Sequence, residues 1–426
     1  MARTSRRTFL QLAGTAGAVS AFGIAGCGEG AARVVVIGGG FGGATAAKYI
    51  RKFDPTVQVT LIEPKTHFTS CPFSNLYLGG IRSFDSITFG YDNLRDDDGV
   101  VVVHETVTGF DPDKKMVMTD KGSSFPYDKL VVSPGVGFKW EETPGYDMAA
   151  AQLVPHAWNG GPQTKILHDQ LRAMDDGGVV VIAPPANPFR CPPGPYERAS
   201  MIAHYLKYNK PKSKVLILDS KDKFSKQGLF MEGWKQHYGD MIEWVPRSKD
   251  GKVVSVNAKD NVAETEFEKH KAAVLNYIPL QKANDIAFTM GLADAKGWCP
   301  IDHKTFESTL QKNVYVLGDA ATVNGMPKSG NAANTQAKVC AAAVVDSLAG
   351  REPGVPTTTN TCYSLITPTH GISVTAVYQL TDKGYRGKAG SGGLSPLGEG
   401  AKFRKAEANY ARGWFANITN DIWSRT

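Results

Sequence analysis

A glycine-rich stretch near the N-terminus, Arg33–Ala44, constrains the fold of this chain more than any other segment. It begins with a run of β-branched residues, as expected for a buried strand, and turns through Gly38, Gly40 and Gly43 into a predicted helix. This G-x-G-x-x-G spacing permits a tight turn, close approach of a pyrophosphate to the backbone, and tight packing of helix on strand. Glu63 ends a second predicted strand 25 residues after Gly38, where an acid can hold a ribose 2′-hydroxyl. The stretch therefore predicts a dinucleotide-binding βαβ unit that takes NAD or FAD rather than NADP.

The composition is that of a soluble α/β protein with two or three domains. The chain has 426 residues, 42% of them hydrophobic, which is enough to bury a sizeable core. Three arginines and one glutamate in residues 1–30 account for +2 of the formal net charge of +7. No basic cluster is interleaved with aromatic residues, so nucleic acid is not an expected partner.

The N-terminus is typical of an exported protein. Arg6 and Arg7 directly precede an uncharged apolar stretch, residues 12–25, that is too short to span a membrane. We interpret residues 1–30 as a twin-arginine signal peptide, which predicts export of the folded protein to a bacterial periplasm. The residues before Cys27 also resemble a lipoprotein box, so a lipid anchor at Cys27 and cleavage beyond it are both open at this stage.

A second βαβ unit is predicted from the apolar runs Val179–Ile182 and Lys214–Leu218, but the turn between them is altered. Residues 183–198 carry prolines where a dinucleotide fingerprint would carry glycines. Prolines remove N–H donors and add bulk where a pyrophosphate would lie, so nicotinamide binding is expected to be lost. The altered turn instead contains Cys191, with Glu197 close behind it.

Two further segments predict FAD. A predicted strand ends in Gly318 and Asp319, where an aspartate can accept a hydrogen bond from the ribityl chain of a flavin. Lys328 and Ser329 then precede a predicted helix of small residues over 331–349. The positive end of that helix would face the pyrimidine side of the flavin ring and stabilise its reduced, anionic form.

The six cysteines form no C-x-x-C or metal-ligand pattern. Cys71 follows the first βαβ unit, where it could contact a flavin or serve as a small buried residue. Cys191 and Cys362 lie 171 residues apart and would form a redox disulfide if their loops converge, or a structural disulfide that fastens the C-terminal segment. Cys299 and Cys340 are expected to be buried thiols.

Taken together, these segments resemble the flavoprotein subunit of flavocytochrome c sulfide dehydrogenase, a relative of sulfide:quinone oxidoreductase within the glutathione reductase superfamily. The resemblance runs from about Arg33 to the C-terminus and is most specific in APPANPFRCPPGPYER, residues 183–198. Residues 316–319, 327–330 and 360–363 also match. In that family an exported FAD subunit oxidises sulfide at a cysteine pair on the flavin and passes electrons singly to a c-type cytochrome subunit.

The resemblance implies a role for each candidate residue. Cys191 and Cys362 are implied to be the redox pair, and Cys71 the covalent attachment point of FAD through an 8α-S-cysteinyl thioether. Glu197 would act as a base or orient the attacking hydrosulfide. The chain has no C-x-x-C-H haem site, so the haem is expected on a separate cytochrome subunit.

The expected fold class is α/β, with two Rossmann-like dinucleotide-binding domains of the glutathione reductase type and a C-terminal module. After the signal peptide we expect the first part of the FAD domain over 31–150 and a degenerate NAD-binding-like domain over 151–273. The second part of the FAD domain follows over 274–355, beginning with a strand, Val274–Pro279, that returns to the first domain. A C-terminal interface module, 356–426, would end in an amphipathic helix.

Two other functions compete with this interpretation. Sulfide:quinone oxidoreductase would pass the electrons to quinone, but the leader, the lack of an apolar C-terminal helix and the lack of a cysteine between Cys71 and Cys191 argue against it. A non-catalytic flavin electron-relay protein with a structural disulfide is a second alternative, and it predicts a flavin that sulfide does not bleach. The role of Trp414, which could lie close to the flavin, is open.

Overall fold

The computed structural model describes residues 30–423, and the described residues from Ala32 onward belong to one compact unit. The predicted signal peptide and Cys27 lie outside the described residues. Within 30–423 no helix is both long enough and apolar enough to cross a membrane.

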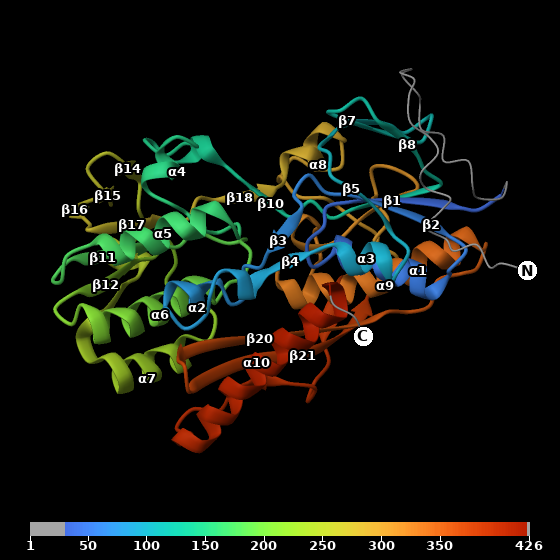
Figure 1. Ribbon diagram of the computed structural model, residues 1–426. Coiled ribbons are helices and arrows are strands. Elements are labelled where there is room, and N and C mark those ends of the chain that lie inside the picture. The colour runs from blue at the N-terminus through green and yellow to red at the C-terminus, as the bar shows by residue number, and fades with distance from the viewer. Residues whose placement is uncertain (1–29, 424–426) are drawn as a thin grey trace, which may run out of the picture. The chain divides into compact units, whose positions relative to one another are not determined.

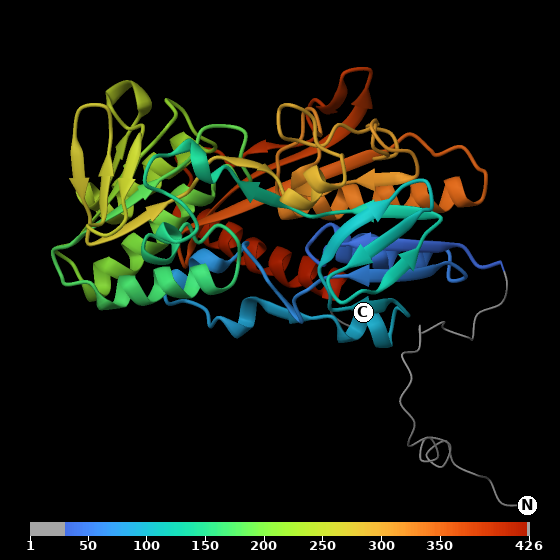
Figure 2. The ribbon, with the colours of Figure 1, turned by 90° about the horizontal axis from the view of Figure 1, so that it is seen from above.

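The first sheet carries the glycine-rich stretch. Its five parallel strands follow the order β19-β9-β1-β2-β5, with β1 at the centre. Helices α1 and α9 cover one face, and the antiparallel sheet β6–β8 lies over the other (Figures 1 and 2). Residues on both faces are therefore buried, which explains why the strands are nearly continuous apolar runs. The bounds are β1 Arg33–Ile37, β2 Gln58–Ile62, β5 Val101–Val103, β6 Val107–Asp111, β7 Met116–Thr119, β8 Ser124–Pro126, β9 Lys129–Val132, β19 Val314–Val316, α1 Gly43–Phe53 and α9 Gly330–Leu348.

The second sheet is also parallel, with the order β13-β12-β11-β17. The predicted βαβ unit with the altered turn is present as β11, α6 and β12. The small antiparallel sheet β14–β16 belongs to the same half of the chain. The bounds are β11 Val179–Ala183, β12 Lys214–Leu218, β13 Ile242–Val245, β14 Ser255–Asn257, β15 Val262–Glu264, β16 Lys269–Lys271, β17 Val274–Tyr277, α5 Pro162–Ala173, α6 Gly194–Asn209 and α7 Gln227–Tyr238.

The prediction that Val274–Pro279 returns to the first domain is wrong. These residues form β17, which pairs in parallel with β11 of the second sheet. A short apolar run predicts a buried strand but not the sheet that it joins, and all four residues of β17 are buried there. The chain crosses back only afterwards, through β18 (Gln281–Ala283), which pairs with β10 (Val136–Phe138). The predicted domain boundary at residue 274 therefore falls too early.

The connections between the two sheets contain short elements that position loops. Strands β3 and β4 pair with each other, and α2 packs against α5 and α6 of the second half. The loop with Cys71 lies between β3 and α2. These elements are β3 His67–Thr69, α2 Ser74–Leu78, β4 Thr88–Gly90, α3 Asp92–Asp96, α4 Ala150–Leu153 and α8 Asp285–Thr289.

The C-terminal segment contacts both halves rather than standing apart from them. Its long hairpin, β20 and β21, contacts α6, α9 and the final helix α10 (Figure 1). The predicted helix at the C-terminus is confirmed as α10. It buries Ala408, Ala411, Phe415, Ile418 and Ile422, a three–four spacing that places one apolar stripe against the protein. The bounds are β20 Thr357–Thr367, β21 His370–Thr381, β22 Gly384–Gly387, β23 Gly393–Leu394 and α10 Ala401–Trp423.

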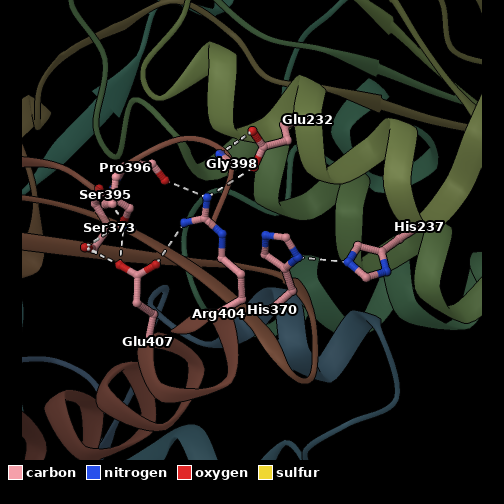
Figure 3. Close-up of polar contacts among 9 residues, drawn as sticks. All are labelled: Glu232, His237, His370, Ser373, Ser395, Pro396, Gly398, Arg404 and Glu407. Atoms are coloured by element: carbon pink, nitrogen blue, oxygen red, sulfur yellow. Dashed lines mark hydrogen bonds and ion pairs between the residues drawn. The ribbon is translucent and has the colours of Figure 1, made fainter. Parts of the chain in front are cut away.

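A polar cluster around the buried Arg404, which we call the C-terminal clamp, joins this segment to α7 of the second half (Figure 3). It consists of Glu232, His237, His370, Arg404 and Glu407. The Arg404 guanidinium is 3.2 Å from a carboxylate oxygen of Glu407 and 3.1 Å from one of Glu232, and its side chain is only 2% exposed. His237 Nε2 and His370 Nδ1 share a hydrogen bond of 2.8 Å. The clamp therefore fastens β21 and α10 to α7.

The histidine pair predicts that acid weakens the fold. Burial, followed by the charges of His237 and Arg404, lowers the pKa of His370 to about 4, although Glu232 opposes the shift. The unfolded chain binds this proton near pH 6.5, so stability is lost as the pH falls from about 6.5 towards 4. We expect the free energy of unfolding to fall by about 1–2 kcal/mol more between pH 7 and 5 in the natural protein than in His370→Gln. Urea titrations at the two pH values measure this difference, and equal losses in both proteins would contradict it.

Candidate active site

The glycine-rich turn after β1 has the close contacts that its sequence predicts. Gly38 has a φ of +97°, and a Cβ there would lie 2.4 Å from the carbonyl oxygen of Ser133. A Cβ on Gly43 would lie 1.8 Å from the carbonyl oxygen of Gly38. Neither position can hold a larger residue without moving the backbone. The turn and the tight packing of α1 on β1 are thus confirmed.

This turn borders a cavity of about 360 Å³, which we call the dinucleotide cavity. Gly38, Gly40 and Glu63 line it from the first βαβ unit, and Gly318 and Asp319 line it from the turn after β19. Glu63 Oε2 accepts a hydrogen bond of 2.9 Å from the amide of Gly39. The cavity therefore brings together residues that the sequence separates by more than 250 positions.

Asp319 leaves one acceptor unsatisfied at the edge of this cavity. Its Oδ1 is buried and has no hydrogen-bond partner within residues 30–423. Burial raises the pKa of Asp319, whereas the charges of Arg190 and Lys328 lower it. A buried carboxylate oxygen without a donor is costly, and a ribityl hydroxyl would supply that donor.

Lys328 and Ser329 support the cavity from outside its lining. Lys328 Nζ donates hydrogen bonds of 2.8 Å to the carbonyl oxygens of Asp319 and Ala321, and burial lowers its pKa to about 8. Ser329 Oγ accepts a hydrogen bond of 3.1 Å from the amide of Ala332 and so caps α9. In this structure these two residues fix the Asp319 turn and the start of α9.

A second cavity, of about 70 Å³, contains the two predicted redox cysteines, and we call it the cysteine cavity. Cys191 comes from the loop before α6 and Cys362 from β20. Both are free thiols, and Glu197 lines the same cavity. Cys191 has a φ of +55°, unusual for a residue other than glycine, and its amide donates a hydrogen bond of 2.9 Å to the carbonyl of Lys328.

The two cavities meet at one wall. Cys71, Pro72, Arg190 and Gly330 line both of them. Arg190 Nη2 donates a hydrogen bond of 3.1 Å to Cys71 Sγ. A group bound in the dinucleotide cavity can therefore reach the wall behind which the cysteine pair lies.

Glu197 is held by hydrogen bonds from two different elements, α2 and β20. Its Oε2 accepts a hydrogen bond of 2.9 Å from Asn75 Nδ2, and its Oε1 accepts one of 2.9 Å from the amide of Leu365. Burial raises the pKa of Glu197, although these hydrogen bonds and the charges of Lys226 and Arg198 oppose the shift. A buried carboxyl that other groups hold in place inside a cavity is suited to accept and return a proton.

The cysteine thiols are strongly influenced by burial. Burial raises the pKa of Cys191, and the nearby Cys362, Glu197 and Cys71 raise it further, while Arg190 lowers it. Burial also raises the pKa of Cys362, which Lys226 lowers. Each sulfur of the pair thus has a different cation as its electrostatic neighbour.

Some residues of this site could not be identified as functional from the sequence. Lys226 is buried, and its Nζ donates hydrogen bonds to the carbonyl oxygen of Cys362, at 3.0 Å, and to Ser364 Oγ, at 2.8 Å. Arg198 is also buried, and its guanidinium binds Asn276 Oδ1 at 2.8 Å. Arg198 could have been suspected, because it directly follows Glu197 in the altered turn. Lys226 could not, because a single lysine in a polar loop has no pattern that indicates a function.

Of the remaining residues considered in the sequence, Trp414 lies at the site, and Cys299 and Cys340 lie in the core. Trp414 lines the cysteine cavity, and its Nε1 is buried without a hydrogen-bond partner in the described chain. Cys299 and Cys340 are buried free thiols outside both cavities, as expected. Among residues 30–423, no group of three or more His, Cys, Asp or Glu side chains is arranged to hold a metal ion.

Three family models match the chain. Residues 32–170 match "Pyridine nucleotide-disulphide oxidoreductase". Residues 164–279 match "Sulfide dehydrogenase [flavocytochrome c] flavoprotein chain, central", and residues 355–423 match "Flavocytochrome c sulphide dehydrogenase, flavin-binding". These segments include the first fingerprint, the altered turn with Cys191, and the hairpin with Cys362.

Known proteins agree with these matches. The sulfide dehydrogenase [flavocytochrome c] flavoprotein chain of Chlorobaculum thiosulfatiphilum is 70% identical over 46 residues, which are 11% of this chain and 96% of that one. The mitochondrial sulfide:quinone oxidoreductase of Dictyostelium discoideum is 23% identical over 351 residues, 76% of this chain and 72% of that one. The solved sulfide:quinone oxidoreductase of Aquifex aeolicus has a TM-score of 0.69 at 18% identity and covers 93% of each chain.

The fold and the matched segments define a flavin-binding oxidoreductase with a pyridine nucleotide-disulphide oxidoreductase domain. The expected α/β fold of the glutathione reductase type is thus confirmed. Within that class, the chain belongs to the family of flavocytochrome c sulfide dehydrogenase flavoprotein chains, which is related to sulfide:quinone oxidoreductase. It is an oxidoreductase of this family.

Proposed function

We propose that this chain oxidises hydrosulfide to zero-valent sulfur or polysulfide at Cys191 and Cys362, and passes the electrons through FAD to a c-type cytochrome subunit. One observation carries the proposal. Two cysteines from distant segments and the carboxyl of Glu197 line one small cavity, which shares a wall with the dinucleotide cavity. A cavity of about 70 Å³ suits a substrate as small as hydrosulfide.

FAD would be held by the residues of the dinucleotide cavity. The turn from Gly38 to Gly43 and the start of α1 would bind the pyrophosphate, Glu63 the ribose, and Asp319 the ribityl chain. Cys71 would hold the flavin covalently as an 8α-S-cysteinyl thioether. When bound, FAD supplies an acceptor that takes an electron pair and releases single electrons.

The chain's own residues would carry the sulfur chemistry. In the oxidised enzyme Cys191 and Cys362 form a disulfide, and hydrosulfide attacks one sulfur. The S–S bond breaks, the attacked cysteine becomes a persulfide, and the other leaves as a thiolate. A second hydrosulfide then takes the outer sulfur of the persulfide away as polysulfide and frees that cysteine as a thiolate. The two thiolates re-form the disulfide, and the electron pair that this releases would be accepted by FAD when it is bound in the neighbouring cavity.

Glu197 would take the proton of the incoming sulfide, and this role predicts a pH dependence. Its raised pKa means that the carboxylate, and with it the rate of flavin reduction by sulfide, increases as the pH rises through that pKa. Glu197→Gln keeps the size of the side chain and an acceptor for the Leu365 amide. We expect a rate about 10²–10⁴-fold lower with this rising limb removed. Stopped-flow absorbance across pH measures both, and an unchanged profile would contradict the role.

The electron acceptor is proposed to be a separate protein. The sequence has no C-x-x-C-H motif, which supports a haem carried by a partner subunit. The leader supports export to the periplasm by the twin-arginine route, with either a lipid at Cys27 or cleavage beyond it.

A quinone is the alternative acceptor, favoured by the likeness of this fold to sulfide:quinone oxidoreductase. The experiment is to reduce the holoenzyme with sulfide under anaerobic conditions and add either oxidised cytochrome c or a soluble quinone. Rapid reoxidation of the flavin by cytochrome c supports the proposal. Reoxidation by quinone alone would assign the chain to the alternative, and a flavin that sulfide leaves oxidised would indicate a relay protein.

A further inference from the structure

Arg190 and Cys71 contact each other in the wall that the two cavities share. Arg190 Nη2 lies 3.1 Å from Cys71 Sγ, although the two residues are 119 positions apart. Cys71 Sγ also lies 3.0 Å from the carbonyl oxygen of Trp158, to which a thiol can donate. The same Nη2 donates to that carbonyl. The sulfur therefore has both a hydrogen-bond acceptor and a cation within hydrogen-bonding distance.

Arg190 is held in place by other groups. Its backbone amide donates a hydrogen bond of 2.9 Å to Gln281 Oε1, and Nη2 donates one of 3.2 Å to Asn159 Oδ1. Its Nε is buried without a hydrogen-bond partner in the described chain and lies 4.0 Å from Asp319 Oδ2. The side chain is 17% exposed. The guanidinium is thus fixed beside Cys71 and is not a freely moving surface charge.

The acceptor and the cation favour different forms of the sulfur. The Trp158 carbonyl can accept a proton from the thiol but repels a thiolate, because both would then present lone pairs. Arg190 can donate to a thiolate, and a hydrogen bond from a charged donor is stronger than one between neutral groups. Burial lowers the pKa of Arg190, but the neighbouring Cys71 and Asp319 raise it, so the guanidinium stays charged.

We propose that Arg190 activates Cys71 for its covalent attachment to FAD. This inference rests on the proposed thioether at Cys71 and adds the residue that makes the bond form. Arg190 would donate its hydrogen bond to the Cys71 sulfur while that sulfur acts as the nucleophile. The sulfur forms a bond to the methyl carbon at flavin position 8, and a C–H bond of that methyl breaks and releases its proton to solvent. The electron pair stays on the flavin, which is reduced by two electrons, and the one-electron haem acceptor of the proposed function removes them.

Covalent yield in purified holoprotein tests the inference without an activity assay. Each protein is precipitated in acid, and the flavin that stays with the chain is measured by absorbance and by intact mass. Total FAD is measured in a native sample. We expect Arg190→Gln to bind FAD with at least a tenfold lower covalent fraction than the natural protein. Arg190→Lys keeps the positive charge but not the planar guanidinium with its several N–H donors. Its covalent fraction should lie between those of the natural protein and Arg190→Gln.

Two variants provide matched controls. Cys71→Ser should hold FAD without any covalent fraction, which tests the thioether itself. Arg172→Gln removes another half-buried arginine, whose Nη1 donates a hydrogen bond of 2.7 Å to the carbonyl of Leu78 away from both cavities. Its covalent fraction should equal that of the natural protein.

The outcomes separate this inference from the proposed function. A natural protein without covalent FAD would contradict the thioether, and the inference with it. A covalent natural protein and an equally covalent Arg190→Gln variant would overturn the inference alone. If Arg190→Gln binds no FAD at all, Arg190→Lys decides: a reduced covalent fraction at normal FAD content supports the role, and an unchanged fraction overturns it.

Discussion

Replacing Cys362 with serine is expected to slow the reduction of the flavin by sulfide about 10³-fold or more. Without the Cys362 sulfur no disulfide can form with Cys191, so hydrosulfide has no sulfur–sulfur bond to attack. The loss of a nucleophilic partner that acts as part of a unit costs rate factors of this order or larger. Anaerobic stopped-flow absorbance of the flavin band measures the rate directly.

The control for this substitution is a cysteine outside both cavities. Cys299 is buried, and burial raises its pKa to about 12, so it is not a reactive thiol. Cys299→Ala should keep the natural rate, and Cys191→Ser should lose as much as Cys362→Ser. Dithionite should reduce the flavin in all of these proteins. Reduction by sulfide at the natural rate in Cys362→Ser would contradict the proposed redox pair.

Replacing Arg404 with methionine is expected to lower the free energy of unfolding by about 3–5 kcal/mol. Arg404 is the cation of the C-terminal clamp, and methionine keeps much of its volume while removing its charge. Glu407, with a side chain 8% exposed, would then be a buried carboxylate without its cation, and Glu232 would lose its contact too. Removing one partner of a buried ion pair costs more than the pair contributes, because the remaining charge stays desolvated. Urea unfolding of the holoprotein measures the loss.

A double variant tests whether the unpaired charge is the cause. Arg404→Met with Glu407→Gln removes both charges, so it should recover a substantial part of the lost stability. If the double variant were less stable than Arg404→Met, the clamp would contribute mainly through packing or through its neutral hydrogen bonds. A loss below about 1 kcal/mol in Arg404→Met, the size of an exposed ion pair, would contradict its buried role.

The fold was predictable where local sequence and close packing determine it together. Gly38 and Gly43 predict the turn, because only a residue without a Cβ fits at these positions. The strand before them is predicted by its run of β-branched residues. The helix α10 was likewise predicted, although the apolar stripe that it buries is identified only by the structure. The sheet that β17 joins was not, since a four-residue apolar run looks the same in either sheet.

The site was predictable where the side chains, cysteine and glutamate, are of types that take part directly in redox or proton-transfer reactions. Cys191, Cys362 and Glu197 were identified from an unusual proline-rich turn and a family resemblance, and the structure brings them to one cavity. Lys226 was missed because its position next to Cys362 depends on β20 crossing over α7, a contact between segments 136 positions apart. Long-range pairs of this kind leave no local pattern in a single sequence.

The most direct test of the central claim is an anaerobic titration of the purified holoenzyme with sulfide while the oxidised flavin band is followed. We predict that the band bleaches with sulfide in the natural protein and in Cys299→Ala, and that it remains in Cys191→Ser and Cys362→Ser until dithionite is added. A natural enzyme whose flavin stays oxidised in sulfide but bleaches with dithionite would contradict the account, because the cysteine pair would then pass no electrons from sulfide to FAD.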